Sequence, residues 1–210
     1  MEPPKPQPTL YTVGHSNRDF KEFLALLRAH AIGRIVDVRT IPKSRRVPWF
    51  NEEELAPALN QARIRYAHLP ELGGLRHPKK DSTNLGWKNE SFRGYADYME
   101  EPGFEKGLEK LNAMLSDLKT AVMCAEAVPW RCHRSLIADA EISRGISVEH
   151  LMSPTSKKPH EMTSFAVVDK KSKPPKISYP AHEEEKAQPA LPGMPSAPAK
   201  KSHPKNPKQK

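Results

Sequence analysis

The chain has few cysteines and no long hydrophobic run. Two cysteines among 210 residues are too few for a disulfide framework. No apolar stretch approaches the roughly 20 residues that a membrane-spanning helix needs. The first eight residues, MEPPKPQP, contain no apolar core of a signal peptide. Together these absences predict a cytoplasmic protein with reduced thiols and no membrane partner.

Several common cofactor motifs are also absent. The sequence has no Walker loop, no G-x-G-x-x-G and no G-x-S-x-G. This argues against P-loop NTPases, dinucleotide enzymes of the usual kind and α/β-hydrolases. Seven residues separate Cys124 from Cys132, a spacing that matches no familiar zinc knuckle. Adjacent Cys132 and His133 cannot readily both point at one ion, so we expect no metal and no cofactor.

Positive charge is concentrated near the end of the chain. Residues 1–150 carry 22 Lys and Arg against 20 Asp and Glu, whereas the last 60 residues carry 12 Lys, 5 acidic residues and 11 of the 22 prolines. This composition is typical of a disordered segment. We expect a disordered lead over 1–8, an α/β domain over 9–153 and a basic low-complexity tail over 154–210. The tail either contacts polyanions or only improves solubility.

Short apolar, β-prone runs alternate with segments of helical periodicity. This order predicts an α/β fold of three layers, in which helices flank a mostly parallel sheet joined by right-handed crossovers. Ser16 or Asn17 is expected to cap the first helix, and Gly145 to end the last one. The expected strands are 10–13, 34–38, 65–69, 120–124 and 147–151, and the expected helices are 20–30, 52–62, 92–100, 104–118 and 135–144.

Polar side chains follow three of the predicted strands. The carboxyl ends of parallel strands share one edge of a sheet, and in open α/β sheets ligands bind there. Polar groups from separate parts of the chain are therefore expected to converge at a single rim. The first strand contributes His15 and Ser16, the second Asp37 and Arg39, and the fourth Cys124 and Glu126, with Cys132, His133 and Arg134 opening the next helix.

The two cysteines differ in their sequence surroundings. Cys132 lies near a helix N-terminus among Arg131, His133 and Arg134, and both the helix dipole and these cations favour a thiolate. It is either a nucleophilic or redox thiol, or a small residue packed under the sheet. Cys124 ends an apolar strand and is expected to be a packing residue. A reversible disulfide between the two requires a narrow geometry that the sequence does not reveal.

Arginines are the second group of candidates at the rim. Arg39, Arg45, Arg46 and Arg134, together with the N–H groups of the helix after Cys132, have the chemistry of an anion cradle for phosphate or carboxylate. The alternative is that Arg39 pairs with Asp37 or Glu126 in a structural network. In that case the carboxylates orient the arginines instead of acting as general acids or bases.

Short motifs follow one another along the chain: Thr12–Asn17, Val36–Arg39 with Pro42 and Ser44, Leu72–Gly74, Phe92 with Gly94–Ala96, Cys124–Glu126 and Cys132–Arg134. In order and type these motifs resemble the family named domain of unknown function 488. The resemblance covers about residues 9–153 and implies a bacterial-type α/β domain with no settled activity. Residues 155–210 lie outside the pattern.

The leading functional hypothesis is an enzyme that acts on an anionic, nucleotide-like or nucleic-acid substrate. One alternative is a non-enzymatic nucleic-acid or nucleotide binding module. Another is a thiol redox or sulfur-transfer protein. The candidate catalytic residues are Cys132, Glu126, Asp37 and His15, and the candidate substrate-binding residues are Arg39, Arg45, Arg46, Arg134, His133 and Ser16.

Overall fold

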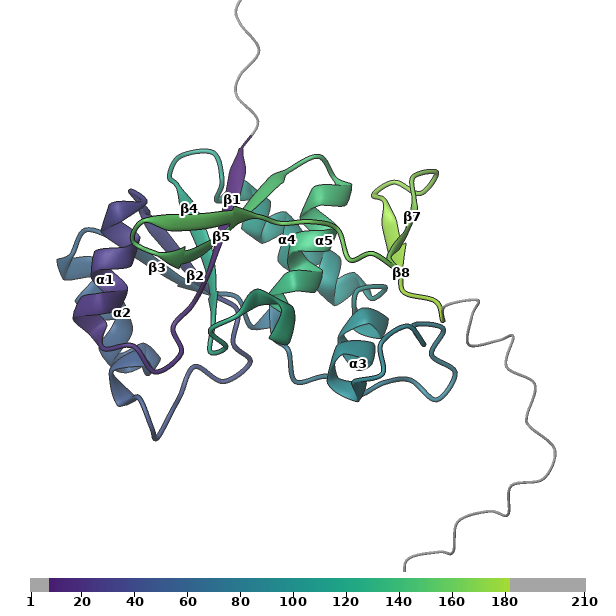
Figure 1. The fold of residues 1–210 in the computed structure, drawn as a ribbon, viewed down its shortest axis with the longest axis horizontal. Coiled ribbons are helices and arrows are strands. Elements are labelled where there is room, and N and C mark those ends of the chain that lie inside the picture. Colours follow the sequence, from purple (N-terminus) through teal and green to yellow (C-terminus); the bar gives the residue numbers. More distant parts are fainter. Residues whose placement is uncertain (1–7, 182–210) are drawn as a thin grey trace, which may run out of the picture.

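Two layers of helices enclose a six-stranded sheet in the computed structural model, which describes residues 8–181 (Figure 1). The strand order is β3-β2-β4-β1-β5-β6; the first five strands are parallel and β6 is antiparallel. The strands are β1 Thr9–Gly14, β2 Arg34–Asp37, β3 Arg65–His68, β4 Thr120–Cys124, β5 Ser147–Ser153 and β6 Ser156–Pro159, and a separate hairpin pairs β7 Val167–Asp169 with β8 Lys176–Ser178.

The helices follow the strands as the periodicity predicts. They are α1 Phe20–Ala29, α2 Glu52–Gln61, α3 Glu90–Tyr98, α4 Pro102–Ala113 and α5 Arg134–Ser143, with short 3₁₀ turns η1 Pro48–Phe50, η2 Pro70–Leu72 and η3 Pro129–Arg131. The α/β fold with a mostly parallel sheet is therefore confirmed. Within residues 8–181, no helix combines the length and the apolar character that crossing a bilayer requires.

The central strand β4 shows how the two layers form. Its side chains alternate between the faces of the sheet, as strand geometry requires. Ala121 and Met123 belong to the core under α1 and α2, whereas Val122 and Cys124 belong to the core under α3, α4 and α5. Continuous burial of β4 on both faces is typical of a parallel sheet covered by helices.

The start of α1 and the end of α5 are the two places where capping residues were predicted. Asp19, and not Ser16 or Asn17, caps α1, since its side chain accepts a hydrogen bond from the Glu22 amide. Ser16 instead adopts a positive φ of 52° in the turn after β1. Gly145, with a φ of 84°, follows α5 as expected, because a left-handed residue commonly ends a helix.

Ordered structure extends past the predicted end of the domain. The expectation of a low-complexity tail from residue 154 is wrong over 154–181, where β6 extends the sheet and β7 pairs with β8. Tyr179 is fully buried, and its hydroxyl donates to Asp139 at 2.9 Å. The rest of the predicted tail, 182–210, and the lead up to residue 7 lie outside the described residues.

The connections that follow the neighbouring strands β1 and β4 lead to helices on opposite faces of the sheet. The chain passes from β1 to α1 on one face and from β4 to α5 on the other. The two strands are paired in register, with Gly14 opposite Cys124, and β2 flanks β4 on its other side, with Asp37 opposite Met123. Such a switch point opens a crevice at the carboxyl ends of the strands, where polar side chains converge.

Candidate functional site

A pocket of about 440 Å³ lies at the carboxyl ends of β1, β2 and β4. Five residues expected at the rim line it together, as the topology predicts: His15, Arg39, Glu126, Cys132 and His133. Cys124 lines it as well. Asp37 and Arg134 are buried beside these residues and contact them. Ser16, Arg45 and Arg46 are not among the lining residues.

The two thiols face each other in the wall of the pocket. The Cys132 thiol donates to the Cys124 sulfur, and the two sulfurs are 2.7 Å apart. Both side chains are buried, and both cysteines are free. The loop that the sequence places between them therefore folds back and brings the sulfurs to a distance from which a bond forms with little movement.

Arg134 acts on Cys124 and not on the thiol that is nearer in sequence. Its Nη1 donates to the Cys124 sulfur and to the Glu126 carbonyl, and its Nη2 donates to the Ala127 carbonyl at 2.9 Å. The side chain is 1% exposed. Arg134 is therefore an internal partner of the thiol pair, and it does not contribute to an open anion cradle.

These contacts give the two thiols different pKa values. Burial alone would raise the pKa of Cys124, but the hydrogen bond from Cys132 and the charge and hydrogen bond of Arg134 outweigh burial and lower the pKa to about 7. The hydrogen bond to Cys124 and burial raise the pKa of Cys132 well above its usual range. Cys124 is therefore the thiol that ionises first, the reverse of the order that flanking residues suggested.

Gly14 leaves the space that Arg134 needs. A Cβ added at Gly14 would lie 1.7 Å from the Glu126 carbonyl oxygen and 3.0 Å from Arg134 Nη1. A side chain there is incompatible with the backbone of the loop after β4. The glycine at the end of β1 thus allows the β4 loop to pass close enough to receive the guanidinium.

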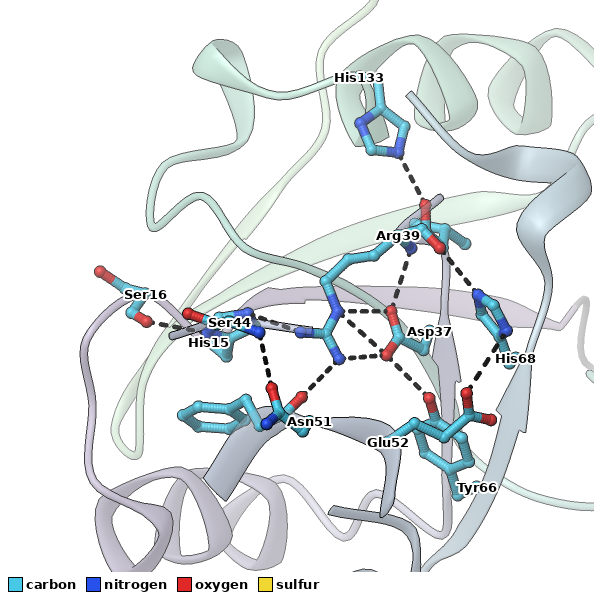
Figure 2. A network of polar contacts seen from close by, with 12 residues as sticks. His15, Ser16, Asp37, Arg39, Ser44, Asn51, Glu52, Tyr66, His68 and His133 are labelled. Atoms are coloured by element: carbon cyan, nitrogen blue, oxygen red, sulfur yellow. Dashed lines mark hydrogen bonds and ion pairs between the residues drawn. The ribbon is translucent and has the colours of Figure 1, made fainter. Parts of the chain in front are cut away.

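Asp37 and Arg39 form a buried ion pair beside the pocket (Figure 2). Arg39 Nε and Nη2 both donate to the Asp37 carboxylate, and Nη2 also donates to the Phe50 carbonyl. Tyr66 donates its hydroxyl to the same carboxylate at 2.9 Å, and burial and the charge of Asp37 raise the pKa of that hydroxyl. The alternative expected for Arg39, a network with Asp37, is the observed arrangement.

His15 has a fixed tautomer. Its Nδ1 lies 2.8 Å from the Ser16 carbonyl, which only accepts, so Nδ1 carries the hydrogen. Nε2 is then an acceptor, and it meets Arg39 Nη1 at 3.3 Å (Figure 2). Burial, foremost, lowers the pKa of His15 to about 4, and the ring stacks on Phe50 with centroids 4.3 Å apart. A neutral His15 therefore positions Arg39.

His133 is held in the same way on the other side of the thiols. Its Nε2 lies 3.2 Å from the Val38 carbonyl, which places the hydrogen on Nε2, and its Nδ1 lies 3.6 Å from the Cys132 sulfur. Burial, foremost, lowers the pKa of His133 to about 4. A Cβ added at Gly74 would lie 2.4 Å from Nδ1, so the glycine turn after η2 fits directly against this ring.

Several site residues have no clear signal in the sequence. Ile41 and Leu75 line the pocket from two loops. Isolated apolar residues in irregular segments follow no periodicity, so patterning does not find them. Tyr66 was identifiable only as a residue of β3, since its contact with Asp37 depends on the pairing of β2 with β3.

A second polar cluster lies beyond β5. Thr12 contacts His150 at 2.7 Å, His150 contacts His160 at 3.0 Å, and His160 contacts Asp139 at 2.8 Å. These contacts use both nitrogens of both rings and leave none for a ligand. Across residues 8–181, no group of three or more His, Cys, Asp or Glu side chains has the arrangement of a metal site.

Comparisons with known proteins identify a family and no individual relative. The family model described as Domain of unknown function DUF488 matches residues 19–141, within the range over which the motifs indicated the resemblance. No curated protein and no solved structure matches the chain. Since the matched segment covers more than half of the sequence, the chain belongs to the DUF488 family.

Proposed function

We propose that this protein is a thiol–disulfide redox protein in which Cys124 and Cys132 form a reversible disulfide. The observation that carries the proposal is the 2.7 Å contact between the two sulfurs in the wall of a pocket. The guanidinium of Arg134 on the Cys124 sulfur supports it, because a neighbouring cation favours the nucleophilic thiolate.

The reaction divides into two exchanges. The Cys124 thiolate attacks one sulfur of a small disulfide RSSR, so that a bond from Cys124 to one sulfur forms and one RS⁻ leaves. The thiol of Cys132 then loses its proton and attacks the Cys124 sulfur, which expels the second RS⁻. The protein loses two hydrogen atoms, and RSSR is reduced to two RSH. In the reverse direction, two RSH reduce the protein disulfide.

The neighbouring residues have defined tasks in this scheme. Arg134 stabilises the thiolate of Cys124 before the first attack. His133 Nδ1 lies 3.6 Å from the Cys132 sulfur, and because its pKa is lowered to about 4 the ring stays neutral and helps to position that thiol. The proton that Cys132 loses in the second attack goes to the expelled RS⁻, which is the stronger base. A reversible thiol pair is compatible with the reducing compartment that we expect, the cytoplasm.

The proposal is tested by trapping the two steps separately. The reduced full-length protein is incubated with glutathione disulfide at pH 7 and its mass is measured. Wild type should lose two hydrogen atoms and retain no glutathione. Cys132→Ser should stop at a mixed disulfide on Cys124. Cys124→Ser, the matched control, should form far less mixed disulfide at the same pH, because burial still raises the pKa of Cys132 and the Arg134 guanidinium donates to position 124 and not to the Cys132 sulfur.

Two outcomes would overturn this assignment. One is a wild-type protein whose mass is unchanged under conditions that oxidise a free dithiol. The other is a faster mixed disulfide at Cys132 than at Cys124, which would restore Cys132 as the first nucleophile. Both are read from the same spectra after proteolysis, which assigns the modified cysteine.

An enzyme for an anionic, nucleotide-like or nucleic-acid substrate stays a prediction with less support. Arg134 is occupied by Cys124 and two carbonyls, and Arg39 by Asp37 and Phe50. Arg45 and Arg46 are exposed but do not line the pocket. The nucleic-acid binding alternative would rest on these exposed arginines and on the lysines after residue 154, and its affinity would fall steeply with salt.

A further inference from the structure

The mouth of the pocket is apolar. Ile41 is 60% exposed and Leu75 is 72% exposed, and both line the pocket together with the half-buried ring of Phe92. Single exposed hydrophobic residues are common on protein surfaces, but three that converge on one cavity indicate an apolar ligand. A ligand that enters here covers these side chains and removes them from water.

Arg39 provides one polar contact inside this apolar mouth. A guanidinium has five N–H groups. Nε and both hydrogens of Nη2 are used by Asp37 and Phe50, and one hydrogen of Nη1 is used by His15 Nε2 (Figure 2). None of residues 8–181 accepts the second Nη1 hydrogen, which is left for a ligand. Because the surrounding contacts hold the side chain in place, this donor is preorganised.

The other charges around the pocket compensate each other. Lys43 forms an ion pair with Glu53. Arg131 and Glu126, both exposed, contribute one charge of each sign. The positive charge of Arg39 is balanced by Asp37. The pocket therefore offers one oriented donor and no large positive field, which suits a ligand with a single acidic group and not a polyanion.

We propose that the pocket selects a small, mainly apolar thiol or disulfide that carries one carboxylate, bound by Arg39. Ile41, Leu75 and Phe92 contact its apolar body, and its sulfur faces Cys124. This inference names the substrate class of the redox pair and rests on that proposed function for the role of the sulfur. The binding preference itself depends only on the pocket.

The preference is measured with probes that contain no sulfur. The reduced full-length protein is titrated with 4-phenylbutyrate and with 4-phenylbutanol, which has a similar apolar body but no charge. A charge-assisted hydrogen bond from Arg39 should make the dissociation constant of the acid at least about tenfold lower. The acid should also slow alkylation of Cys124, which locates it in this pocket. The ratio should persist in high salt, because a contact with a buried arginine is screened less than surface attraction.

A matched pair of variants tests the apolar contact. Leu75→Asn should weaken both probes by a similar factor and keep their ratio. Leu85→Asn, the control, changes a residue that is 52% exposed and does not line the pocket, and should leave both constants unchanged. Equal binding of acid and alcohol would overturn the role of Arg39. An unchanged affinity in Leu75→Asn would overturn the apolar subsite.

These results are independent of the redox assay. If the probes bind as expected but the dithiol does not exchange with glutathione disulfide, the pocket assignment stands and the redox function fails. If the dithiol exchanges but the acid binds no better than the alcohol, the redox function stands and the substrate class is wrong.

Discussion

The chemistry of each thiol is decided by side-chain direction and not by neighbours in sequence. In an α-helix the Cα–Cβ bonds tilt toward the N-terminus. Arg134 is the first residue of α5, so its side chain extends back past the helix to the end of β4 and reaches Cys124. Counting cations around Cys132 therefore assigns the charge to the wrong sulfur.

Removing the guanidinium of Arg134 should make Cys124 less reactive. Because the pKa of Cys124 is lowered, a substantial fraction of this thiol is ionised at pH 7. In Arg134→Gln the charge and its hydrogen bond are lost, so the pKa rises and the thiolate fraction at pH 7 falls to a small percentage. The rate of iodoacetamide alkylation of Cys124, followed by mass spectrometry across pH, should show its midpoint move upward.

The conservative variant separates charge from packing. Arg134→Lys keeps a cation near Cys124 but loses the planar set of donors. Its alkylation midpoint should lie between those of wild type and Arg134→Gln. If all three proteins show the same midpoint, Arg134 does not lower the pKa of Cys124.

Helix α5 has an unusual polar interior. Asp139 and Glu141 are both fully buried. Asp139 accepts from His160, Thr163 and Tyr179, but within residues 8–181 no hydrogen bond of ordinary geometry reaches either carboxyl oxygen of Glu141. Unpaired carboxylates are costly to bury, and the proton then stays on the group. One face of α5 is thus held by the segment after β5, while the other contains a carboxyl group that resists ionisation.

Glu141 should make the protein less stable as the pH rises. Burial, foremost, raises the pKa of Glu141 to about 7, although the charge of Arg144 acts in the opposite direction. The unfolded pKa is about 4.3. The folded state therefore holds a proton that the unfolded state has lost, and stability falls as the pH rises from about 4 to about 7. The total change is on the order of 4 kcal/mol, at 1.36 kcal/mol for each pKa unit.

Glu141→Gln should remove this dependence, because the amide stays neutral. Urea unfolding of both proteins at pH 5 and pH 8 gives the difference in unfolding free energy at each pH. The unfolding free energy of the variant, relative to that of wild type, should be higher at pH 8 than at pH 5. His15, His133 and His150, whose pKa values are lowered, titrate equally in both proteins and cancel. A difference that is the same at both pH values would contradict the raised pKa.

The sequence predicts the elements and the location of the site, but not the contacts between individual side chains. Apolar period and capping residues act over a few positions, so most strand and helix boundaries agree within a few residues. The rim follows from topology, because parallel strands end at one edge. Pairwise contacts do not follow. The choice of Arg134 between two sulfurs, or of Tyr66 for Asp37, depends on register and side-chain direction, which no local pattern encodes.

The average composition of the segment after residue 153 gives the wrong prediction for the end of the domain. Segment 154–181 is rich in lysine and proline, yet all of its lysines are exposed, in β6, in β8 and in the turn between β7 and β8, and only a few of its residues are buried. Ile177 and Tyr179 enter the main core cluster, and the Tyr179 amide and carbonyl bond to Asn84 and Gly86. A small number of buried positions anchors a segment whose average composition is that of a disordered chain.

Truncation distinguishes the two possible ends of the domain. A chain of residues 1–153 loses β6 and the burial of Ile177 and Tyr179, and each large side chain contributes about 1.5–3 kcal/mol when fully buried. It also removes four hydrogen bonds to the Asp139 carboxylate, which come from His160, Tyr179 and the amide and hydroxyl of Thr163. This chain should unfold at much lower urea concentration than the full-length protein, or fail to fold.

A chain of residues 1–181 keeps all of these contacts and should match the full-length unfolding free energy within about 0.5 kcal/mol. Equal stability of the 1–153 chain would show that the segment after β5 is not part of the folding unit.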